Sequence, residues 1–191
     1  APPSPTPMAA RRVGKSVLDK PLPKKSNELG LSAFGFLFSE FIQYSQQRVN
    51  TAEELEHKLE EIGLGIGHRA LELGCLREKS SRRETRMLGI LQFITSVVWK
   101  MLFGSAAKDA VSLEKSVEQE DEFMIVEKQP LVSTYISSAP CSCAAFVAGI
   151  VRGVLEGAQF PARVSAHDED SRTVILIKFA PEVLEREQRL S

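Results

Sequence analysis

The sequence predicts an α+β fold, with one domain over residues 30–191 in which three helices precede a hairpin, a helix, a second hairpin and a short last helix. Two observations support this class. Apolar residues recur at helical spacing as far as residue 103, and beyond it short alternating segments are separated by Pro, Gly and acidic residues. Because those strands are expected in hairpins, we predict a small, mostly antiparallel sheet with helices packed on one side.

Composition narrows the class of protein. The 191 residues are 43% apolar and 26% charged, which is the mix of a globular domain with its own core. The formal net charge is −1, so no global field is expected to hold nucleic acid or an anionic membrane. Three cysteines form no disulfide framework and no apolar signal segment is visible, which favours a reducing, cytosolic compartment.

Residues 1–29 are rich in Pro and Lys, and we expect them to form a flexible arm. Residues 1–7 are expected to be a leader ahead of Met8, native or not. Residues 11–28 carry six Lys or Arg against two acidic residues, but this segment is short and lacks aromatic side chains. It therefore does not indicate a nucleic-acid site.

The first helix is expected to begin after Ser32 as its N-cap. The residues of its predicted buried stripe follow at i, i+3, i+4 and i+7: Phe34, Leu37, Phe38 and Phe41. Phe36, Ile42 and Tyr44 lie partly outside that stripe. One buried face is therefore not enough to cover the apolar residues of this helix.

The second helix begins with a T-x-x-E capping box formed by Thr51 and Glu54. A narrow apolar seam follows: Leu55, Leu59, Ile62, Ile66 and Leu73. Beside it lie Gly63, Gly67 and Gly74. An interior glycine costs a helix about 1 kcal/mol relative to alanine, so the glycines indicate that another backbone comes close. A frayed or kinked helix is the alternative.

Residues 84–103 predict a third helix that ends at Gly104 as a C-cap. Apolar residues surround it, but four polar residues interrupt the run: Gln92, Thr95, Ser96 and Lys100. A bilayer span needs about 20 apolar residues, so we predict a buried central helix. Residues 105–121 are polar and acidic, and a loop or short helix is expected there.

The second half of the chain predicts the sheet. Strands are expected over residues 123–127 and 131–137, joined at 128–130, and over residues 163–167 and 173–179, joined at 168–171. A helix over residues 142–157 separates the hairpins. Its small residues recur every four positions and predict a smooth ridge lying on the sheet: Ala145, Gly149, Gly153 and Gly157. Pro181 opens a last helix over residues 182–190.

Nucleotide-binding patterns are incomplete. Gly14, Lys15 and Ser16 resemble the end of a phosphate-binding loop, but Ala9 stands where the first glycine is required. The glycines at 63, 65 and 67 lie inside a capped helix, and His68 breaks the dinucleotide spacing. No nucleotide cofactor is therefore expected.

Cys141 and Cys143 are close in sequence, whereas the other candidate zinc ligands are scattered. We predict two small buried thiols at a helix start and no metal. Spacing alone leaves a Cys/His nucleophile pair open, because such partners meet only in the fold, but no activation motif surrounds Cys75, Cys141 or Cys143. The sequence predicts no catalytic residue. The basic cluster at residues 77–86 indicates a solvated helix junction or a docking patch for an acidic partner.

Six stretches resemble the small α/β subunits of TRAPP, the transport protein particle, and within that family they are most like its fifth-subunit branch. They are residues 31–40 (LSAFGFLFSE), 82–86 (RRETR), 98–104 (VWKMLFG), 130–137 (PLVSTYIS), 143–151 (CAAFVAGIV) and 160–167 (FPARVSAH). They follow in the right order over about residues 13–190. A match this extended is more specific than any short catalytic pattern.

The resemblance implies a structural, non-catalytic subunit of a vesicle-tethering complex that acts as a guanine-nucleotide exchange factor for a Rab GTPase in ER-to-Golgi transport. It implies pairing with a sister α/β subunit as a heterodimer, contact with a small adaptor-type subunit, and a cytoplasmic place on early Golgi and ER–Golgi intermediate membranes. The GTPase and the membrane are then reached through the complex, with no nucleic acid and no cofactor.

The expected partner interface lies on the first two helices: Phe36, Phe41, Tyr44, Leu55, Leu59, Ile62, Gly63, Ile66 and Gly67. On this hypothesis, Gly67→Leu weakens pairing without unfolding the chain. An alternative function is a lipid- or acyl-chain-binding module with an apolar tunnel near the third helix. A paralogous subunit carries an acylated cysteine just ahead of that helix, but residues 77–84 contain none, and Cys75 does not match the motif.

Overall fold

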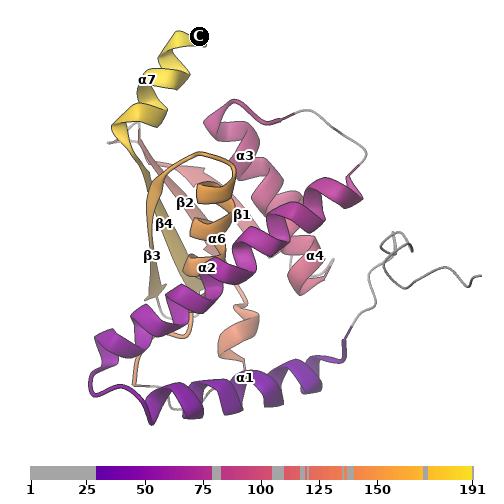
Figure 1. The fold of residues 1–191 in the computed structure, drawn as a ribbon, viewed down its shortest axis with the longest axis vertical. Coiled ribbons are helices and arrows are strands. Elements are labelled where there is room, and N and C mark those ends of the chain that lie inside the picture. Colours follow the sequence, from indigo (N-terminus) through magenta and orange to yellow (C-terminus); the bar gives the residue numbers. More distant parts are fainter. Residues whose placement is uncertain are drawn as a thin grey trace, which may run out of the picture.

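The computed structural model describes residues 29–78, 83–104, 110–116, 119, 121–134, 136, 140–169 and 172–190. Figure 1 shows helices stacked over one face of a small sheet, with α6 next to the sheet and α2 crossing over α6. The helices are α1 (Leu31–Gln46), α2 (Ala52–Arg77), α3 (Met87–Phe93), the π-helical segment η2 (Ile94–Val98), α4 (Trp99–Phe103), α6 (Ala145–Gly157) and α7 (Pro181–Arg189). The predicted α+β class is confirmed.

Among the described residues, four antiparallel strands form the sheet in the order β1-β2-β4-β3. They are β1 (Val111–Lys115), β2 (Glu122–Glu127), β3 (Ala162–Glu169) and β4 (Arg172–Phe179). Two hairpins, β1–β2 and β3–β4, are joined by α6 and meet where β2 pairs with β4. Side chains of alternate residues on β4 point toward the helices and are buried: Thr173, Ile175, Ile177 and Phe179.

The first hairpin is not the predicted one. Residues 111–115, expected in a loop or short helix, form β1, while the predicted strand 131–137 begins instead as a 3₁₀ turn, η3 (Leu131–Ser133). The Thr134 N–H donates to the Leu131 carbonyl at 3.3 Å, and the Thr134 hydroxyl donates to the Pro130 carbonyl at 3.1 Å. These local bonds satisfy groups that a strand would direct to a neighbour. Residues 135 and 137 lie outside the described residues.

The third helix is a composite of α3, η2 and α4, and it begins at Met87 rather than at residue 84. Its first turn is capped from far along the chain, because the Met87 N–H donates to the Glu187 carboxylate on α7 at 3.0 Å. The same carboxylate forms an ion pair with Arg86 at 3.2 Å. Gly104 ends the helix with a φ of 86°, as predicted for a C-cap.

The other predicted helix starts differ in accuracy. Thr51 caps α2 as expected, its hydroxyl oxygen accepting from the Glu54 N–H at 3.1 Å, while the Glu54 carboxylate accepts from Asn50 at 2.8 Å. The predicted start of α1, with Ser32 as the N-cap, was wrong. Gly30 is its N-cap, and Ser32 lies in the first turn, because the Gly30 carbonyl already accepts from Ala33 at 3.0 Å.

Glycines bring α2 and α6 into backbone contact. A Cβ built on Gly63 would meet the Phe146 carbonyl and lie 2.9 Å from the Ile150 nitrogen. From α6, Gly149 and Gly153 face α2 in the same way, and a Cβ on Gly153 would lie 3.0 Å from the Leu64 Cα. The predicted close backbone approach is confirmed, but the ridge of α6 was expected on the sheet and lies on α2 instead.

Gly67 also faces α6, where a Cβ would meet the Ile150 carbonyl and lie 2.9 Å from the Gly153 Cα. The expectation that Gly67→Leu would spare the fold is therefore wrong. No side chain can be placed there without separating two packed helices inside this chain. The close approach that the glycines indicated is made by the chain's own backbone.

Two alanine substitutions on α2 should change stability in opposite directions. Gly67→Ala is expected to lower the free energy of unfolding by about 1–3 kcal/mol, because the added methyl overlaps backbone atoms. Gly65→Ala is the matched control, since the nearest atom to its Cβ would be an Arg69 side-chain nitrogen at 3.6 Å. It should raise stability by about 1 kcal/mol through helix propensity. Chemical denaturation of both variants tests this, and equal effects would contradict the packing described above.

Candidate protein–protein interface

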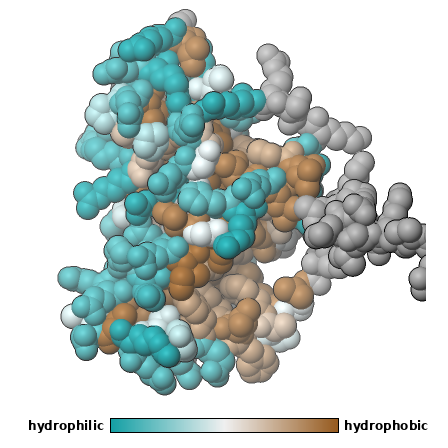
Figure 2. All heavy atoms as spheres, viewed as in Figure 1, coloured by the Kyte–Doolittle hydropathy of each residue, from teal (hydrophilic) through white to brown (hydrophobic). Residues whose placement is uncertain are grey.

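One face of α1 is apolar and has no partner among the described residues. Phe36 is 76% exposed, Leu37 is 72% exposed and Tyr44 is 55% exposed. Positions 36, 37, 40 and 44 fall within about 100° around a helix, so the exposed Glu40 shares this face with the three apolar or aromatic side chains. Figure 2 shows apolar side chains gathered over the part of α1 nearest its start.

The opposite face of α1 holds the helix on the domain. Phe38 is buried, and its ring centroid lies 5.1 Å from that of Phe146 at the start of α6 and 5.5 Å from that of Phe34. Ile42 and Gly35 are buried on the same side. Because this face anchors α1 to the core, the outward face is held in a fixed direction.

Four of the nine predicted interface residues are interior to this chain. Leu55 and Leu59 are 1% and 0% exposed, and Gly63 and Gly67 contact α6. Their placement at a partner interface was wrong, because the seam of α2 is used by the chain's own core. Phe41, Ile62 and Ile66 are partly buried against that core.

Phe36 and Tyr44 remain as the exposed members of the predicted set, and Leu37 joins them. Sequence reasoning placed Leu37 in the buried stripe, at i+3 from Phe34. A second stripe through positions 36, 37 and 44 was present in the sequence and could have revealed it.

Tyr44 forms the polar margin of the α1 face. The Arg48 guanidinium lies 3.4 Å from the centroid of the Tyr44 ring, and Arg48 also donates to the Tyr44 carbonyl at 3.1 Å. Tyr and Arg are enriched at protein interfaces relative to the rest of the surface, and the rim of an interface is polar.

Cys141 and Cys143, just before α6, have no feature of a nucleophile. Burial raises the pKa of Cys143 to about 11, and burial followed by the Glu56 charge raises that of Cys141. Both thiols are therefore protonated at neutral pH and react slowly. Among the described residues, no group of three or more His, Cys, Asp or Glu side chains could hold a metal ion.

A groove of about 720 Å³ lies beside the third helix, where the alternative function placed an apolar tunnel. Apolar residues such as Leu71, Ile90 and Phe93 line it, but charged residues do so too, including Glu78 and Glu84. An acyl chain needs continuous apolar walls, and this groove does not supply them.

None of the helices in the described part of the chain has the length and apolar character to cross a bilayer.

Two of the three described arginines of the basic cluster at residues 77–86 bond to this chain, while the Nε of the third, Arg77, is buried without a hydrogen-bond partner among the described residues. Arg83 donates to the Gln159 side chain at 2.8 Å, and Arg86 pairs with Glu187. Lys79 and Arg82 lie outside the described residues. The solvated-junction interpretation fits these contacts better than a docking patch.

Glu127 is a buried carboxyl group that sequence reasoning did not single out. It is 2% exposed at the end of β2, and the indole N–H of Trp99 donates to it at 3.5 Å. Burial raises its pKa from 4.5 to about 7, and the Trp99 bond lowers it only in part.

Comparison with known proteins identifies the class. Residues 34–180 match the family model described as Transport protein particle (TRAPP) component. The chain belongs to this family of trafficking-complex subunits.

Individual relatives show which subunits of the complex this chain is similar to. The chain is 53% identical over 181 residues to trafficking protein particle complex subunit 5 of Dictyostelium discoideum, covering 90% of this chain and 96% of that protein. It is 42% identical over 182 residues to subunit 5 of Homo sapiens, covering 93% and 95%. Subunit 31 of Saccharomyces cerevisiae is 31% identical over 229 residues, covering 85% and 80%.

A solved structure has the same fold at low sequence identity. It is trafficking protein particle complex subunit 3 from Naegleria fowleri, covalently bound to palmitic acid, with a TM-score of 0.69 and 14% identity. The match covers 78% of this chain and 95% of that one.

Glu127 predicts a pH-dependent stability. Since the folded pKa is about 7 and the unfolded value is 4.5, the folded chain binds more protons between these values. Stability should therefore fall as pH rises through this window and level off above pH 7, by about 3 kcal/mol in all. Glu127→Gln stays neutral and keeps an acceptor for Trp99. Denaturation from pH 4.5 to 8 should show the variant gaining on the parent, and parallel curves would refute the assignment.

Proposed function

We propose that this chain is an interaction subunit of a vesicle-tethering complex, and that it binds a sister α/β subunit as a heterodimer through the outward face of α1. The single observation that carries the proposal is the exposed set Phe36, Leu37 and Tyr44 on a helix whose other face is anchored in the core. Its membership of the TRAPP family supplies the class of partner. The subunit-5 relatives are named as parts of the same kind of complex.

Burial of the outward face of α1 by a partner is energetically favourable. Burying a few hundred Å² of apolar surface contributes several kcal/mol at about 25 cal/mol per Å². Part of this is offset by the loss of translational and rotational freedom on association. A flat apolar helix face with a fixed orientation loses little further entropy when it packs on another helix.

The wider function follows from the family. We propose that the assembled complex exchanges guanine nucleotide on a Rab GTPase in ER-to-Golgi transport, and that this chain contributes structure rather than catalysis. A small adaptor-type subunit is a further proposed neighbour, and the site of action is the cytoplasmic side of early Golgi and ER–Golgi intermediate membranes. Mass spectrometry of the proteins that co-purify with the chain tests this set of partners directly.

Charged substitutions on α1 should abolish pairing. Phe36→Glu with Leu37→Glu places two charges where the partner would exclude water, and we expect at least a hundredfold loss of affinity for the sister subunit. The matched control is Leu76→Glu on α2, where the parent side chain is 62% exposed and lies off the α1 face. Multi-angle light scattering of co-expressed subunits measures the outcome. The unpaired parent chain should self-associate, and a monodisperse parent monomer at micromolar concentration would count against the proposal.

Nucleotide exchange should require assembly. The chain alone is expected to release no nucleotide from a Rab GTPase, and the core assembled without it should lose at least tenfold in rate, which corresponds to about 1.4 kcal/mol. Fluorescent-nucleotide release compares the chain, the full core and the core lacking it. Strong exchange by the chain alone contradicts the first part, and full exchange by the incomplete core contradicts the second.

A further inference from the structure

β3 lies at the end of the sheet, and no strand among the described residues pairs with its outer side. The Ala180 N–H donates to the Pro161 carbonyl at 2.9 Å, which sets the alternation of the β3–β4 ladder. Backbone groups of successive residues in an antiparallel strand point to opposite sides. Ala162, Val164 and Ala166 therefore direct their N–H and C=O groups away from β4, to the open edge.

A groove of about 1090 Å³ follows this edge, bounded by α2 and α6. Four alanines leave it wide: Ala145, Ala148, Ala162 and Ala166. Its charged lining residues are engaged within the chain, because Glu60 pairs with Arg152, Asp121 pairs with Lys178, and Glu56 accepts from the Ser142 N–H. The hydroxyl of Ser142, just before α6, donates to Asp168 at 2.6 Å and so bounds the groove at one end. The open stretch, residues 162–166, is about 13 Å long, measured along the strand axis. This length is enough to pair with a five-residue segment.

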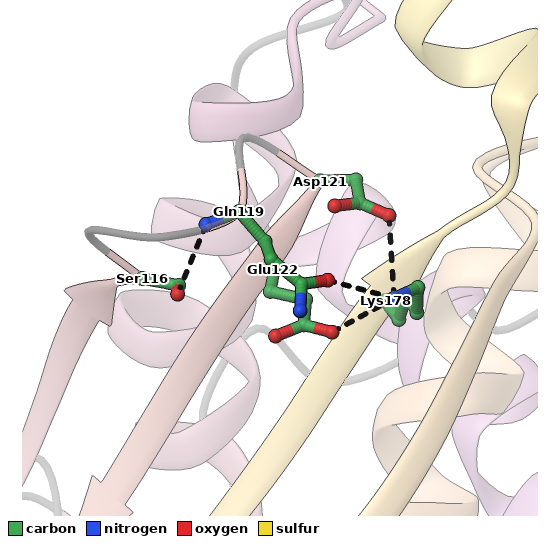
Figure 3. Close-up of polar contacts among 5 residues, drawn as sticks. All are labelled: Ser116, Gln119, Asp121, Glu122 and Lys178. Atoms are coloured by element: carbon green, nitrogen blue, oxygen red, sulfur yellow. Dashed lines mark hydrogen bonds and ion pairs between the residues drawn. The ribbon is translucent and has the colours of Figure 1, made fainter.

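The outer face of the sheet beside this groove carries two neighbouring cations, Lys178 and Arg163, and no described residue neutralises Arg163. Figure 3 shows Lys178 surrounded by acceptors, with Nζ 2.9 Å from Glu122, 2.8 Å from the Gln119 side chain and 3.8 Å from Asp121. Arg163 lies directly across from Lys178 on β3. Arg163 is exposed and has no hydrogen bond or ion pair to any described residue.

We propose that the open edge of β3 binds an extended segment of another protein in which small apolar residues alternate with acidic ones. The segment adds a strand to the sheet and bonds to the backbone of Ala162, Val164 and Ala166. Its small apolar side chains enter the groove, because alternate side chains of a strand point to one face. Its acidic side chains lie on the other face, beside Arg163.

Charge favours an acidic segment of another protein over two other possible occupants, which are the chain's own N-terminal residues and a second copy of the chain. The chain's own residues 11–28 carry six Lys or Arg against two acidic residues, which does not complement Arg163. A second copy fits no better. Antiparallel alignments of two β3 strands through their open edges set Arg163 opposite another Arg163, Ser165, His167 or Glu169. Only Glu169 is acidic, and its carboxylate already accepts from Arg172 at 2.6 Å.

The test uses the full chain together with the subunit that co-purifies with it. The probe is a seven-residue peptide in which valine alternates with glutamate, and the comparison peptide has lysine in place of glutamate. Hydrogen exchange by NMR should show the amides of Ala162, Val164 and Ala166 slowed at least tenfold by the glutamate peptide. The amides of Arg163 and Ser165, already bonded to β4, should change little. The lysine peptide should bind at least tenfold more weakly.

Three variants test separately how the β3 backbone, the groove and the charge of Arg163 contribute to peptide binding. Val164→Pro removes an N–H that β4 does not use, and proline is tolerated at such edge positions, so affinity should fall at least tenfold. Because Val164 is 7% exposed, the variant also loses core contacts, and its thermal stability is measured beside binding. Ala145→Leu fills the groove from α6 and gives an independent loss if the proline variant is unstable. Arg163→Glu should reverse the preference between the two peptides. Lys100→Glu on α4, the same charge change away from the groove, should have no effect.

Other outcomes would overturn the proposal. No alternating protection at millimolar peptide, or equal binding of both peptides, excludes an acidic strand. Binding that appears only after removal of residues 1–28 assigns the edge to the chain's own arm. A concentration-dependent dimer that Val164→Pro abolishes assigns it to a second copy. Because the α1 variants leave β3 untouched, failure here is distinguishable from failure of the proposed heterodimer.

Discussion

The backbone contact between α2 and α6 determines the arrangement of the other elements. Gly63 and Gly67 on one helix meet Gly149 and Gly153 on the other, and each position excludes even a methyl group. With no side chains between them, the helices stack as two close layers on the sheet, and α6 is buried along most of its length. The α1 helix then reaches the core through Phe38 and Phe146, beside this stack.

This contact also determines which surfaces remain available. Because the seam of α2 packs into the chain's own core, Leu55 and Leu59 have no surface to offer to a partner. The outward face of α1 is left as the exposed apolar helix surface, and the open edge of β3 is left with unused backbone groups. The two differ in chemistry. One provides apolar side chains on a rigid helix, and the other provides peptide groups beside small side chains and a cation.

Much of the fold could be predicted from the sequence, because many of its signals are local. The Thr51 cap, the Gly104 stop and the Pro181 start depend on a few neighbouring residues, and all three hold. The glycines showed that a backbone comes close, but a spacing of four residues does not say which one. β1 was missed because its alternation is short and lies in a polar segment. Glu187 caps a helix that starts 100 residues earlier, and the burial of Glu127 also depends on the fold, so neither could be read locally.

The two proposed docking surfaces lie on a rigid frame, and the structure shows how this frame is held together. The glycine contact fixes α2 on α6, and the Glu187 cap ties α7, which follows β4, to the start of the third helix. The α1 face and the β3 edge are therefore both attached to elements that cannot shift independently without breaking buried contacts. In the proposed assembly, a neighbour on α1 and a strand on β3 would keep a constant relative orientation. In that assembly the chain can influence a reaction performed by its neighbours, because it sets the distance and angle between them.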